Sequence, residues 1–293
     1  MAGILASMLD DVLPLLRCPH CGLSLQAAEA SVRCAPGHSF DVARQGYLSL
    51  LPGDARLGSA DTAEMVAARE RFLGAGHFEP LAGALSAKAA RALEAAPGGA
   101  ILDLGAGTGW YLARVLEHAP GRSGLALDLS KHALRRAARA HDRIGAVAAD
   151  AWGALPVREG AAALALSVFA PRNGAELARV LRPGGALIVV VPSDRHLIEL
   201  IEPLGLVSVD ERKRERLDAQ LDPHLRPQGV SELEWTLELS RAGVRDIVAM
   251  GPSARHAKPA ALEEAIASLA EPVPVTASVE ISLHGRAPDE GTG

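Results

Sequence analysis

The stretch ILDLGAGTG, residues 101–109, decides the fold of this chain. A short aliphatic run leads into three glycines, Gly105, Gly107 and Gly109, and Asp103 stands two positions before the first of them. Glycine lets the backbone turn tightly and approach a ligand, and a helix that begins at such a turn presents its N-terminal amides. The stretch therefore predicts a strand, a ligand-binding turn and a helix.

Short aliphatic runs alternate with helical segments from this strand onward. Strands are expected at 101–104, 124–128, 145–149, 163–168, 186–191, 247–250 and 278–283, and helices at 110–118, 131–141, 174–181, 196–204, 231–242 and 259–269. Such alternation predicts an α/β fold with a mostly parallel, doubly wound sheet. Upstream, helical periodicity begins at residue 61 or 62, breaks at the glycines 74 and 76, and resumes over 78–95.

The composition of the 293 residues excludes several classes of protein. With 48% hydrophobic and 22% charged residues, the chain is not largely disordered. The longest apolar run, 186–191, is far shorter than the ~20 residues of a membrane helix. Asp10 and Asp11 interrupt the apolar N-terminus, so we expect a cytoplasmic protein without a signal peptide. The net charge of −5 gives no general basic surface, so we expect no DNA partner and RNA contacts only at local clusters.

All three cysteines, Cys18, Cys21 and Cys34, fall within seventeen positions. With His38 they form the pattern C-x2-C-x12-C-x3-H, two close pairs of the ligand types that close a tetrahedral zinc site. Four protein ligands saturate zinc, so we expect a structural Zn²⁺ ion. The zinc module should run from residue 14 to 52, with short strands at 31–34 and 47–50.

Two other interpretations of the cysteines stay open. The stretch CPHC is similar to a dithiol oxidoreductase motif, although the following GLSL is poor helix material and no thioredoxin-like βαβ pattern surrounds it. The remaining interpretation is three reduced thiols and a surface histidine without a metal.

The glycine spacing and the acidic residues favour S-adenosylmethionine over a dinucleotide. A dinucleotide turn has the form GxGxxG, whereas the third glycine comes one position earlier here. Asp128 ends the second strand, nineteen residues past Gly109, where a carboxylate can accept both ribose hydroxyl protons. Asp103 is placed to hold the amino group of an amino-acid moiety. Asp150, after the third strand, is a candidate for the adenine amine, with a helix cap as the alternative.

Seven stretches between residue 18 and about residue 200 carry a more specific signal: CPHCG, CAPGHSFDVARQGYLSLL, DTAEMVAARERFLGAGHFEPL, DLGAGTG, VFAPRN, RPGG and DRHLIEL. In this combination the chain resembles the 23S ribosomal RNA guanine-N1 methyltransferases, above all the actinomycete branch that protects producers of tylosin- and mycinamicin-type macrolides. The resemblance implies a class I, Rossmann-like S-adenosylmethionine-dependent methyltransferase with a small N-terminal zinc ribbon.

The resemblance also implies site residues and an activity. The family's zinc ligands fall on Cys18, Cys21, Cys34 and His38, and its cofactor contacts on Phe78, Gly107, Thr108 and His196. The implied reaction methylates N1 of a hairpin-loop guanine in 23S rRNA near the peptide exit tunnel, which confers macrolide resistance, and the implied assembly is a homodimer. The expected domains are a zinc-ribbon RNA-recognition module over 1–56, a helical linker over 57–97 and a methyltransferase domain over 98–293.

The stretch VFAPRN, residues 168–173, lies where exocyclic-amine methyltransferases carry Asn or Asp, two prolines and an aromatic residue. The leading polar residue is absent, which argues against adenine-N6 methylation and is compatible with a ring nitrogen. Guanine N1 must lose a proton, and the sequence leaves the catalytic base unidentified. Phe169 is a candidate to stack on an extruded guanine, with burial in the core as the alternative, and Pro171 is the second substrate-pocket candidate.

Three places are candidates for RNA contacts. One basic cluster is Lys131, Arg135, Arg136, Arg139 and Arg143, and a second is Arg212, Lys213, Arg214 and Arg216. Basic helices are more often solvated faces than binding sites. The zinc module, where Arg17, Arg33 and Arg44 are available to phosphates, is the better candidate.

Two other functions stay open on the sequence alone. One is a small-molecule methyltransferase of an antibiotic biosynthetic cluster, in which zinc serves only stability. The other is a non-catalytic zinc-ribbon protein that binds nucleic acid and senses the cofactor through its α/β domain. An assay for methyl transfer separates them.

Overall fold

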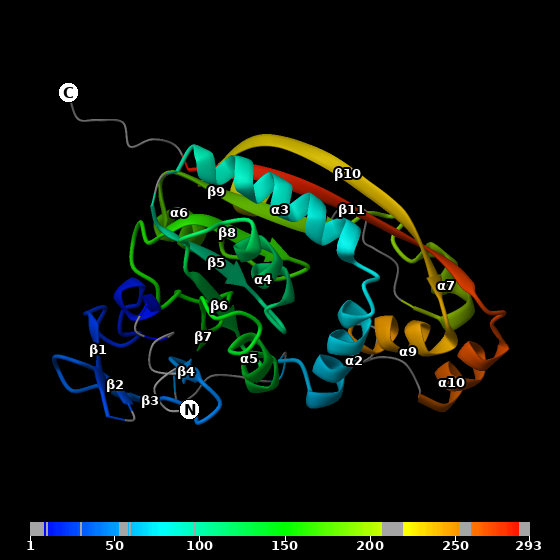
Figure 1. Ribbon diagram of the computed structural model, residues 1–293, viewed down its shortest axis with the longest axis horizontal. Coiled ribbons are helices and arrows are strands. Elements are labelled where there is room, and N and C mark those ends of the chain that lie inside the picture. Colours follow the sequence, from blue (N-terminus) through cyan, green and yellow to red (C-terminus); the bar gives the residue numbers. More distant parts are fainter. Residues whose placement is uncertain are drawn as a thin grey trace.

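The computed structural model describes residues 9, 11–29, 31–52, 58, 60–96, 98–206, 219–251 and 259–286. Its centre is an eight-stranded sheet with the order β10-β11-β9-β8-β5-β6-β7-β4 (Figure 1). The strands are β4 (Tyr47–Ser49), β5 (Ala100–Leu104), β6 (Gly124–Asp128), β7 (Ile144–Ala148), β8 (Ala162–Val168), β9 (Leu181–Pro192), β10 (Arg226–Leu239) and β11 (Val273–Gly285). Strands β4 to β9 pair in parallel, whereas β11 pairs antiparallel with both β9 and β10. The mostly parallel, doubly wound sheet is confirmed.

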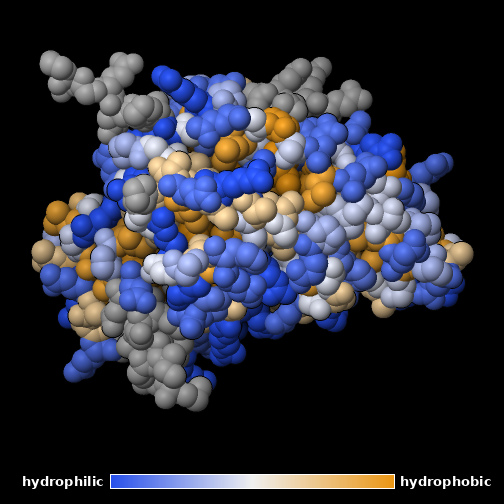
Figure 2. Space-filling model, turned by 45° about the horizontal axis from the view of Figure 1, so that its top comes forward, coloured by the Kyte–Doolittle hydropathy of each residue, from blue (hydrophilic) through white to orange (hydrophobic). Residues whose placement is uncertain are grey.

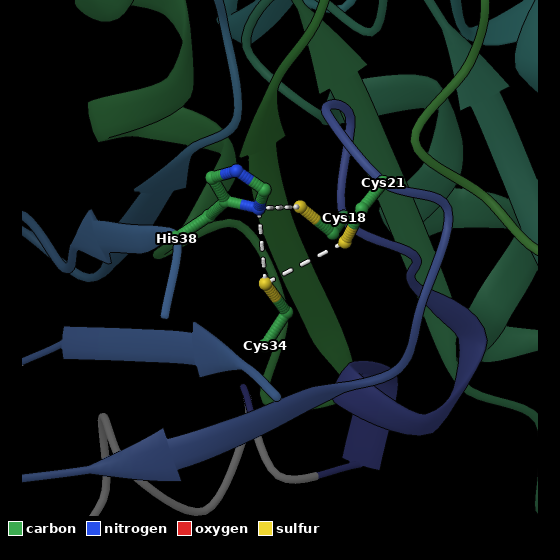
Figure 3. A group of neighbouring side chains, drawn as sticks. All are labelled: Cys18, Cys21, Cys34 and His38. Atoms are coloured by element: carbon green, nitrogen blue, oxygen red, sulfur yellow. Dashed lines mark hydrogen bonds between the residues drawn. The ribbon is translucent and has the colours of Figure 1, made fainter. Parts of the chain in front are cut away.

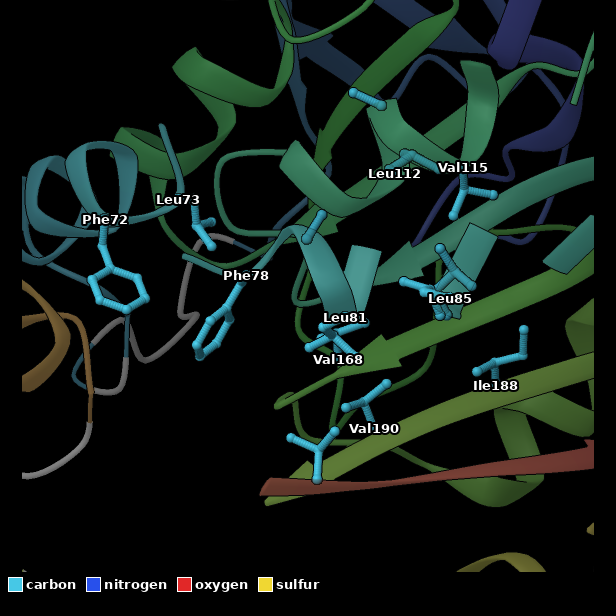
Figure 4. Packing of buried hydrophobic residues seen from close by; sticks show 14 of the residues in the cluster. Phe72, Leu73, Phe78, Leu81, Leu85, Leu112, Val115, Val168, Ile188 and Val190 are labelled. Carbon is cyan, nitrogen blue, oxygen red and sulfur yellow. The ribbon is translucent and has the colours of Figure 1, made fainter. Parts of the chain in front are cut away.

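Helices cover both faces of this sheet. They are α2 (Ala63–Gly74), α3 (Glu79–Glu94), α4 (Trp110–Glu117), α5 (Lys131–Ala137), α6 (Gly174–Val180), α7 (Ile198–Leu204), α9 (Arg241–Ala249) and α10 (Pro259–Ser268). Alternate residues of β5 enter two separate hydrophobic clusters, Ile101 in one and Leu102 in the other. Because successive side chains of a strand point to opposite faces, each face has its own core. Figure 4 shows the first cluster, where α2, α3 and α4 meet the sheet.

The expected elements around the glycine turn are confirmed to within a few residues, but two predictions near the C-terminus are wrong. Residues 231–242 are expected as a helix and 247–250 as a strand. The structure instead has the strand β10 and the helix α9 there. The stretch SELEWTLEL alternates apolar and polar residues with a period of two, which is the pattern of a half-buried strand. Ser240 caps α9 by accepting a hydrogen bond from the Gly243 amide, and Val244, Ile247 and Val248 form its buried face.

The N-terminal lobe is a small antiparallel sheet of β1 (Leu25–Ala28), β2 (Ser31–Cys34) and β3 (Ser39–Asp41). The expected strand at 31–34 is confirmed. The run 47–50, expected as a strand of the zinc module, lies elsewhere: Tyr47–Ser49 forms β4, which extends the large sheet beside β7. Figure 1 shows the lobe at this edge, with the long strands β10 and β11 at the other edge.

No helix in the described part of the chain is long and apolar enough to span a membrane. The face shown in Figure 2 is mostly hydrophilic, and its apolar residues lie in separate patches.

Candidate functional site

Cys18, Cys21, Cys34 and His38 converge in the N-terminal lobe, with all four ligand atoms within 4.8 Å of one another (Figure 3). The Nδ1 atom of His38 lies 3.5 Å from Cys18 Sγ and 3.2 Å from Cys34 Sγ, and Cys21 Sγ lies 3.6 Å from Cys34 Sγ. A tetrahedron with Zn–S of ~2.3 Å and Zn–N of ~2.0 Å places neighbouring ligand atoms ~3.5–3.8 Å apart. The four side chains therefore fit a Zn²⁺ ion that they would hold without an open position.

The lobe is fixed to the eight-stranded sheet through residues 155–158. The backbone amide of Arg17 donates to Pro156 O at 3.0 Å, and that of Arg158 donates to Leu15 O at 2.8 Å. The Arg17 side chain, 31% exposed, donates to Leu155 O at 3.4 Å and lies 3.8 Å from Glu176, so part of its hydrogen-bonding capacity is used within the protein. Arg33 and Arg44 are exposed.

The glycine turn has the geometry that only glycine adopts easily. Gly105, Gly107 and Gly109 have φ of 63°, 56° and 76°, and Gly109 is the N-cap of α4. A Cβ at Gly105 would lie 2.6 Å from the Ala170 Cβ, which is closer than such atoms approach. The turn thus lies against the end of β8, and Thr108 is buried within it.

Asp128 braces this turn from the end of β6. Its carboxylate accepts hydrogen bonds from the Gly107 amide at 2.8 Å and from the Ser130 amide at 2.7 Å, one on each oxygen. Burial raises the pKa of Asp128, and these two hydrogen bonds oppose that rise. Because each carboxylate oxygen has two lone pairs, one remains on each for the two hydroxyls of a ribose.

Asp103 lies at the base of the same site, 2% exposed. No described residue donates a hydrogen bond to its carboxylate. Burial raises the pKa of Asp103 well above its usual range, and the charge of Asp128 raises it further. An ammonium group would supply both the missing donor and the missing opposite charge, which fits the amino group of an amino-acid moiety.

Replacing Asp103 with asparagine is expected to stabilise the free protein by about 1–3 kcal/mol at pH 8 while weakening cofactor binding. The pKa is raised in the native state, so the native protein binds the proton more tightly than the unfolded chain and loses stability as pH rises above the unfolded value of ~3.9. The gain should therefore shrink as pH is lowered toward that value. Urea unfolding at several pH values measures this gain in the free energy of unfolding. The control is Asp142→Asn, because the Asp142 side chain is 85% exposed. A loss of stability at pH 8 would contradict the prediction.

Three aromatic side chains from distant parts of the chain meet above the turn. The ring centroid of Phe78 lies 6.3 Å from those of both Phe169 and His196, and the latter two are 6.0 Å apart. Phe78 is 2% exposed and precedes α3, as Figure 4 shows. The amide of Ser278 donates to His196 Nδ1 at 3.2 Å, which fixes the imidazole. Phe78 and His196, two of the four residues that the resemblance implies as cofactor contacts, thus lie near each other, with Phe169 beside them.

Phe169 combines exposure with a rare backbone conformation. Its side chain is 41% exposed, so the alternative of burial in the core is wrong, and its φ of 54° lies in the left-handed region. Such a conformation in a non-glycine residue costs ~1–2 kcal/mol and is found disproportionately at functional sites. Pro171, two residues on, approaches the glycine turn, with its Cδ 3.8 Å from the place of a Gly105 Cβ.

Asp150 is exposed and accepts a hydrogen bond from the Trp152 amide at 3.0 Å. It therefore stabilises the turn after β7; no helix begins there, so the alternative of a helix cap is wrong. Its second oxygen has no donor among the described residues.

Two of the five residues of the first basic cluster, Arg143 and Arg136, make contacts within the protein. Arg143 donates to Leu116 O, Ala119 O and Arg122 O around the end of α4, and Arg136 pairs with Glu70 at 3.0 Å. Lys131 and Arg139 remain exposed. The second cluster, around residues 212–216, lies outside the described residues.

Arg69 of α2 lies beside the glycine turn, which the sequence did not predict. Its Nη1 lies 3.4 Å from the place of a Gly107 Cβ, so it covers the glycine turn. The available signal was its position in the stretch DTAEMVAARERFLGAGHFEPL, which also contains Phe78.

Two family models match the chain. The zinc-ribbon model described as "RlmA, N-terminal" matches residues 16–56, and the model "Methyltransferase domain" matches residues 101–185. These two matches coincide with the metal-ligand cluster and with the sheet that carries the glycine turn.

Curated relatives match most of the chain. It is 50% identical over 294 residues to a protein of Micromonospora griseorubida provisionally named 23S rRNA (guanine-N(1)-)-methyltransferase, covering 94% of this chain and 99% of that one. It is 48% identical over 276 residues to the 23S rRNA (guanine(748)-N(1))-methyltransferase of Streptomyces fradiae, covering 94% and 98%. A provisionally named 23S rRNA (guanine-N(1)-)-methyltransferase of Bacillus subtilis is 34% identical over 192 residues, covering 64% and 67%.

Proposed function

The chain belongs to the family of 23S rRNA (guanine-N1)-methyltransferases, and on that premise we propose that it transfers the methyl group of S-adenosylmethionine to N1 of a hairpin-loop guanine near the peptide exit tunnel. The observation that carries this proposal is the identity of about half of all residues over 94% of the chain to relatives so named. The Streptomyces fradiae relative is named for guanine 748, and we propose the same target here. Protection against tylosin- and mycinamicin-type macrolides follows from this proposal.

The residues at the glycine turn would hold the cofactor. Asp103 accepts from its ammonium group, Asp128 accepts from its ribose hydroxyls, and Phe78 and His196 enclose it. Gly105, Gly107, Thr108 and Gly109 let it approach the backbone, and Asp150 remains the candidate for the adenine amine. Bound S-adenosylmethionine supplies an electrophilic methyl carbon on a sulfonium.

The protein's contribution to the reaction is mainly the positioning of the base. Guanine N1 attacks in line, so the ring must be held with N1 against the methyl carbon while the N1 proton leaves. Phe169, exposed beside Phe78 and His196, offers a face on which an extruded guanine can stack, and Pro171 forms the adjoining wall. This arrangement agrees with the absence of a leading polar residue before Phe169.

The zinc-bound lobe would present the RNA-binding surface. Arg33 and Arg44 are exposed on it and can contact phosphates, and Lys131 and Arg139 add positive charge on α5 and just beyond it. We further propose that the protein is cytoplasmic, acts as a homodimer and binds neither DNA nor membranes.

Mass mapping of 23S rRNA fragments tests the function directly. Unmodified 23S rRNA incubated with the enzyme and S-adenosylmethionine should gain one methyl group in the fragment that contains guanine 748. Because N1 methylation blocks the Watson–Crick edge, primer extension should stop at the same guanine. Absence of both signals on free rRNA and on assembled subunits, with transfer to a small molecule instead, would overturn the proposal.

Replacing Phe169 with alanine is expected to lower the rate of methyl transfer to RNA by about 10- to 100-fold, because base–aromatic stacking is worth ~1–3 kcal/mol. Binding of S-adenosylhomocysteine, measured by calorimetry, should change by less than about twofold. Phe169→Trp, which keeps a stacking face, should retain most of the activity. An equal loss of methyl transfer in Phe169→Ala and Phe169→Trp would contradict the prediction, because a stacking ring at position 169 would then not determine the rate.

A further inference from the structure

Arg69 lies beside Gly107 of the glycine turn. Its Nη1 and Cδ atoms are 3.4 Å and 3.5 Å from the place where a Cβ of Gly107 would be. A side chain at position 107 would therefore press on the guanidinium. The residue comes from α2, far from the turn in sequence, so this contact is made by the fold.

Two partners hold the guanidinium in place. Nη1 forms an ion pair with the Asp61 carboxylate, and Nη2 donates to Met250 O at 2.9 Å. The backbone carbonyl of Asp61 in turn accepts from Ser130 Oγ at 2.7 Å, next to the Ser130 amide that binds Asp128. Arg69 is thus oriented before any ligand arrives.

The guanidinium keeps unused hydrogen-bonding capacity. It has five N–H donors, and the described residues accept from only two of them. Its side chain is 23% exposed, so a ligand can reach it. A planar group with adjacent free donors matches a carboxylate, which Arg often binds through two parallel hydrogen bonds.

Opposite charges face one site here. Tyr111 is close enough to both residues that Asp103 adds to the rise of its pKa caused by burial, while Arg69 opposes that rise. The turn is therefore flanked by a buried carboxylate without a donor and by a guanidinium with spare donors. An α-amino acid carries the complementary pair, an ammonium and a carboxylate on one carbon.

We propose that Arg69 binds the carboxylate of the methionine moiety of S-adenosylmethionine, while Asp103 binds its ammonium group. This inference rests on the proposed cofactor and adds a residue to its site. It makes Arg69 a selector for amino-acid-bearing cofactors: a ligand that lacks the carboxylate has nothing to offer the free donors.

The test compares S-adenosylmethionine with decarboxylated S-adenosylmethionine by calorimetry. The wild-type protein should bind the decarboxylated ligand about 10- to 100-fold more weakly, since a hydrogen-bonded charge pair contributes about 1.5–3 kcal/mol. Arg69→Gln should weaken S-adenosylmethionine by a similar factor and leave the decarboxylated ligand within about twofold. Arg69→Lys keeps the positive charge but loses the paired donors of the guanidinium, so its affinity for S-adenosylmethionine should lie between those of wild type and Arg69→Gln.

Arg71→Gln is the matched control. Arg71 lies two residues further along α2 and pairs with Asp246 of α9, with its closest N···O distance 2.6 Å, so its loss also removes a link between α2 and α9. It makes no described contact with the turn, and both ligands should bind as they do to wild type.

Equal weakening of both ligands in Arg69→Gln would overturn the inference, because Arg69 would then only support the turn. So would wild-type protein without a preference between the ligands. If the wild-type protein prefers S-adenosylmethionine over the decarboxylated ligand but does not methylate rRNA, the proposed function is refuted and this inference stands. If the enzyme methylates rRNA but Arg69→Gln binds S-adenosylmethionine as tightly as wild type, this inference alone is refuted.

Discussion

Replacing Cys34 with serine is expected to remove the metal from the N-terminal lobe and to unfold that lobe. Cys34 is 5% exposed, and its Sγ lies 3.2 Å from His38 Nδ1 and 3.6 Å from Cys21 Sγ, so its loss removes one of the four ligands of the described cluster. A lobe of about 40 residues cannot build a sufficient hydrophobic core of its own. Zinc-finger peptides of such size depend on ~10–16 kcal/mol of metal binding.

The measurement is metal content by mass spectrometry together with thermal unfolding. Cys34→Ser should fall from about one zinc ion per chain to nearly none, and its melting temperature should drop by at least ~10 °C, since 1 kcal/mol corresponds to ~2–4 °C in a domain of this size. As a control, the same substitution of histidine by glutamine is made at a ligand position and at a neighbouring position that is not a ligand. His38→Gln should lose the metal, whereas His20→Gln, whose ring stacks on Phe40 at 5.8 Å outside the ligand set, should keep it. Zinc retained in Cys34→Ser would contradict the prediction.

Metal loss should also reach the methyltransferase sheet, because the two parts share one core. Phe40 of the lobe belongs to the same hydrophobic cluster as Leu102 of β5 and Val147 of β7. Val12 packs so closely on β7 that a Cβ at Gly145 would lie 2.2 Å from it. We therefore expect cofactor affinity to fall in the zinc-free protein even though no zinc ligand touches the glycine turn.

The central sheet was predictable because its strands are fully buried. All residues of β5 and of β8 are buried, and such strands read as continuous aliphatic runs between glycines and polar turns. The wrong predictions over 231–250 arise because the strand in this region is exposed and not buried. Strand β10 is an edge strand with most of its residues exposed, so its only signal is the alternation of Leu233, Trp235, Leu237 and Leu239.

The site was predictable only where local sequence determines it. Spacing alone predicts Asp103, Asp128 and the metal ligands as site residues, because each lies at a strand end or in a short turn. Phe78 required the resemblance, since an aromatic residue before an amphipathic helix looks like any core residue. Arg69 was missed because its place depends on how α2 packs against α5 and α9, which no local pattern encodes.

Replacing Gly105 with alanine is expected to reduce methyl transfer by at least ~100-fold. The φ of 63° alone costs ~1–2 kcal/mol for a residue with a Cβ, and here the Cβ would also lie 2.6 Å from that of Ala170. Either the glycine turn or the segment 169–171 must move to relieve this overlap. In the proposed function those two segments hold the cofactor and the base, and a displacement of ~1 Å between reacting groups costs about 10²-fold in rate.

Gly121→Ala separates the displacement from the backbone strain. Gly121 has φ of 73° and nothing within 4 Å of the place of its Cβ. It precedes the first residue of β6, whereas the glycine turn follows the last residue of the neighbouring parallel strand β5, so the two glycines lie at opposite ends of these strands. Both variants should lose ~1–2 kcal/mol in urea unfolding from the φ term, but only Gly105→Ala should lose methyl transfer. Similar activity in the two variants would mean that the approach of the turn to β8 does not set the geometry of transfer. A selective loss in Gly105→Ala, with cofactor still bound, would mean that the 2.6 Å approach determines how the methyl donor meets the base.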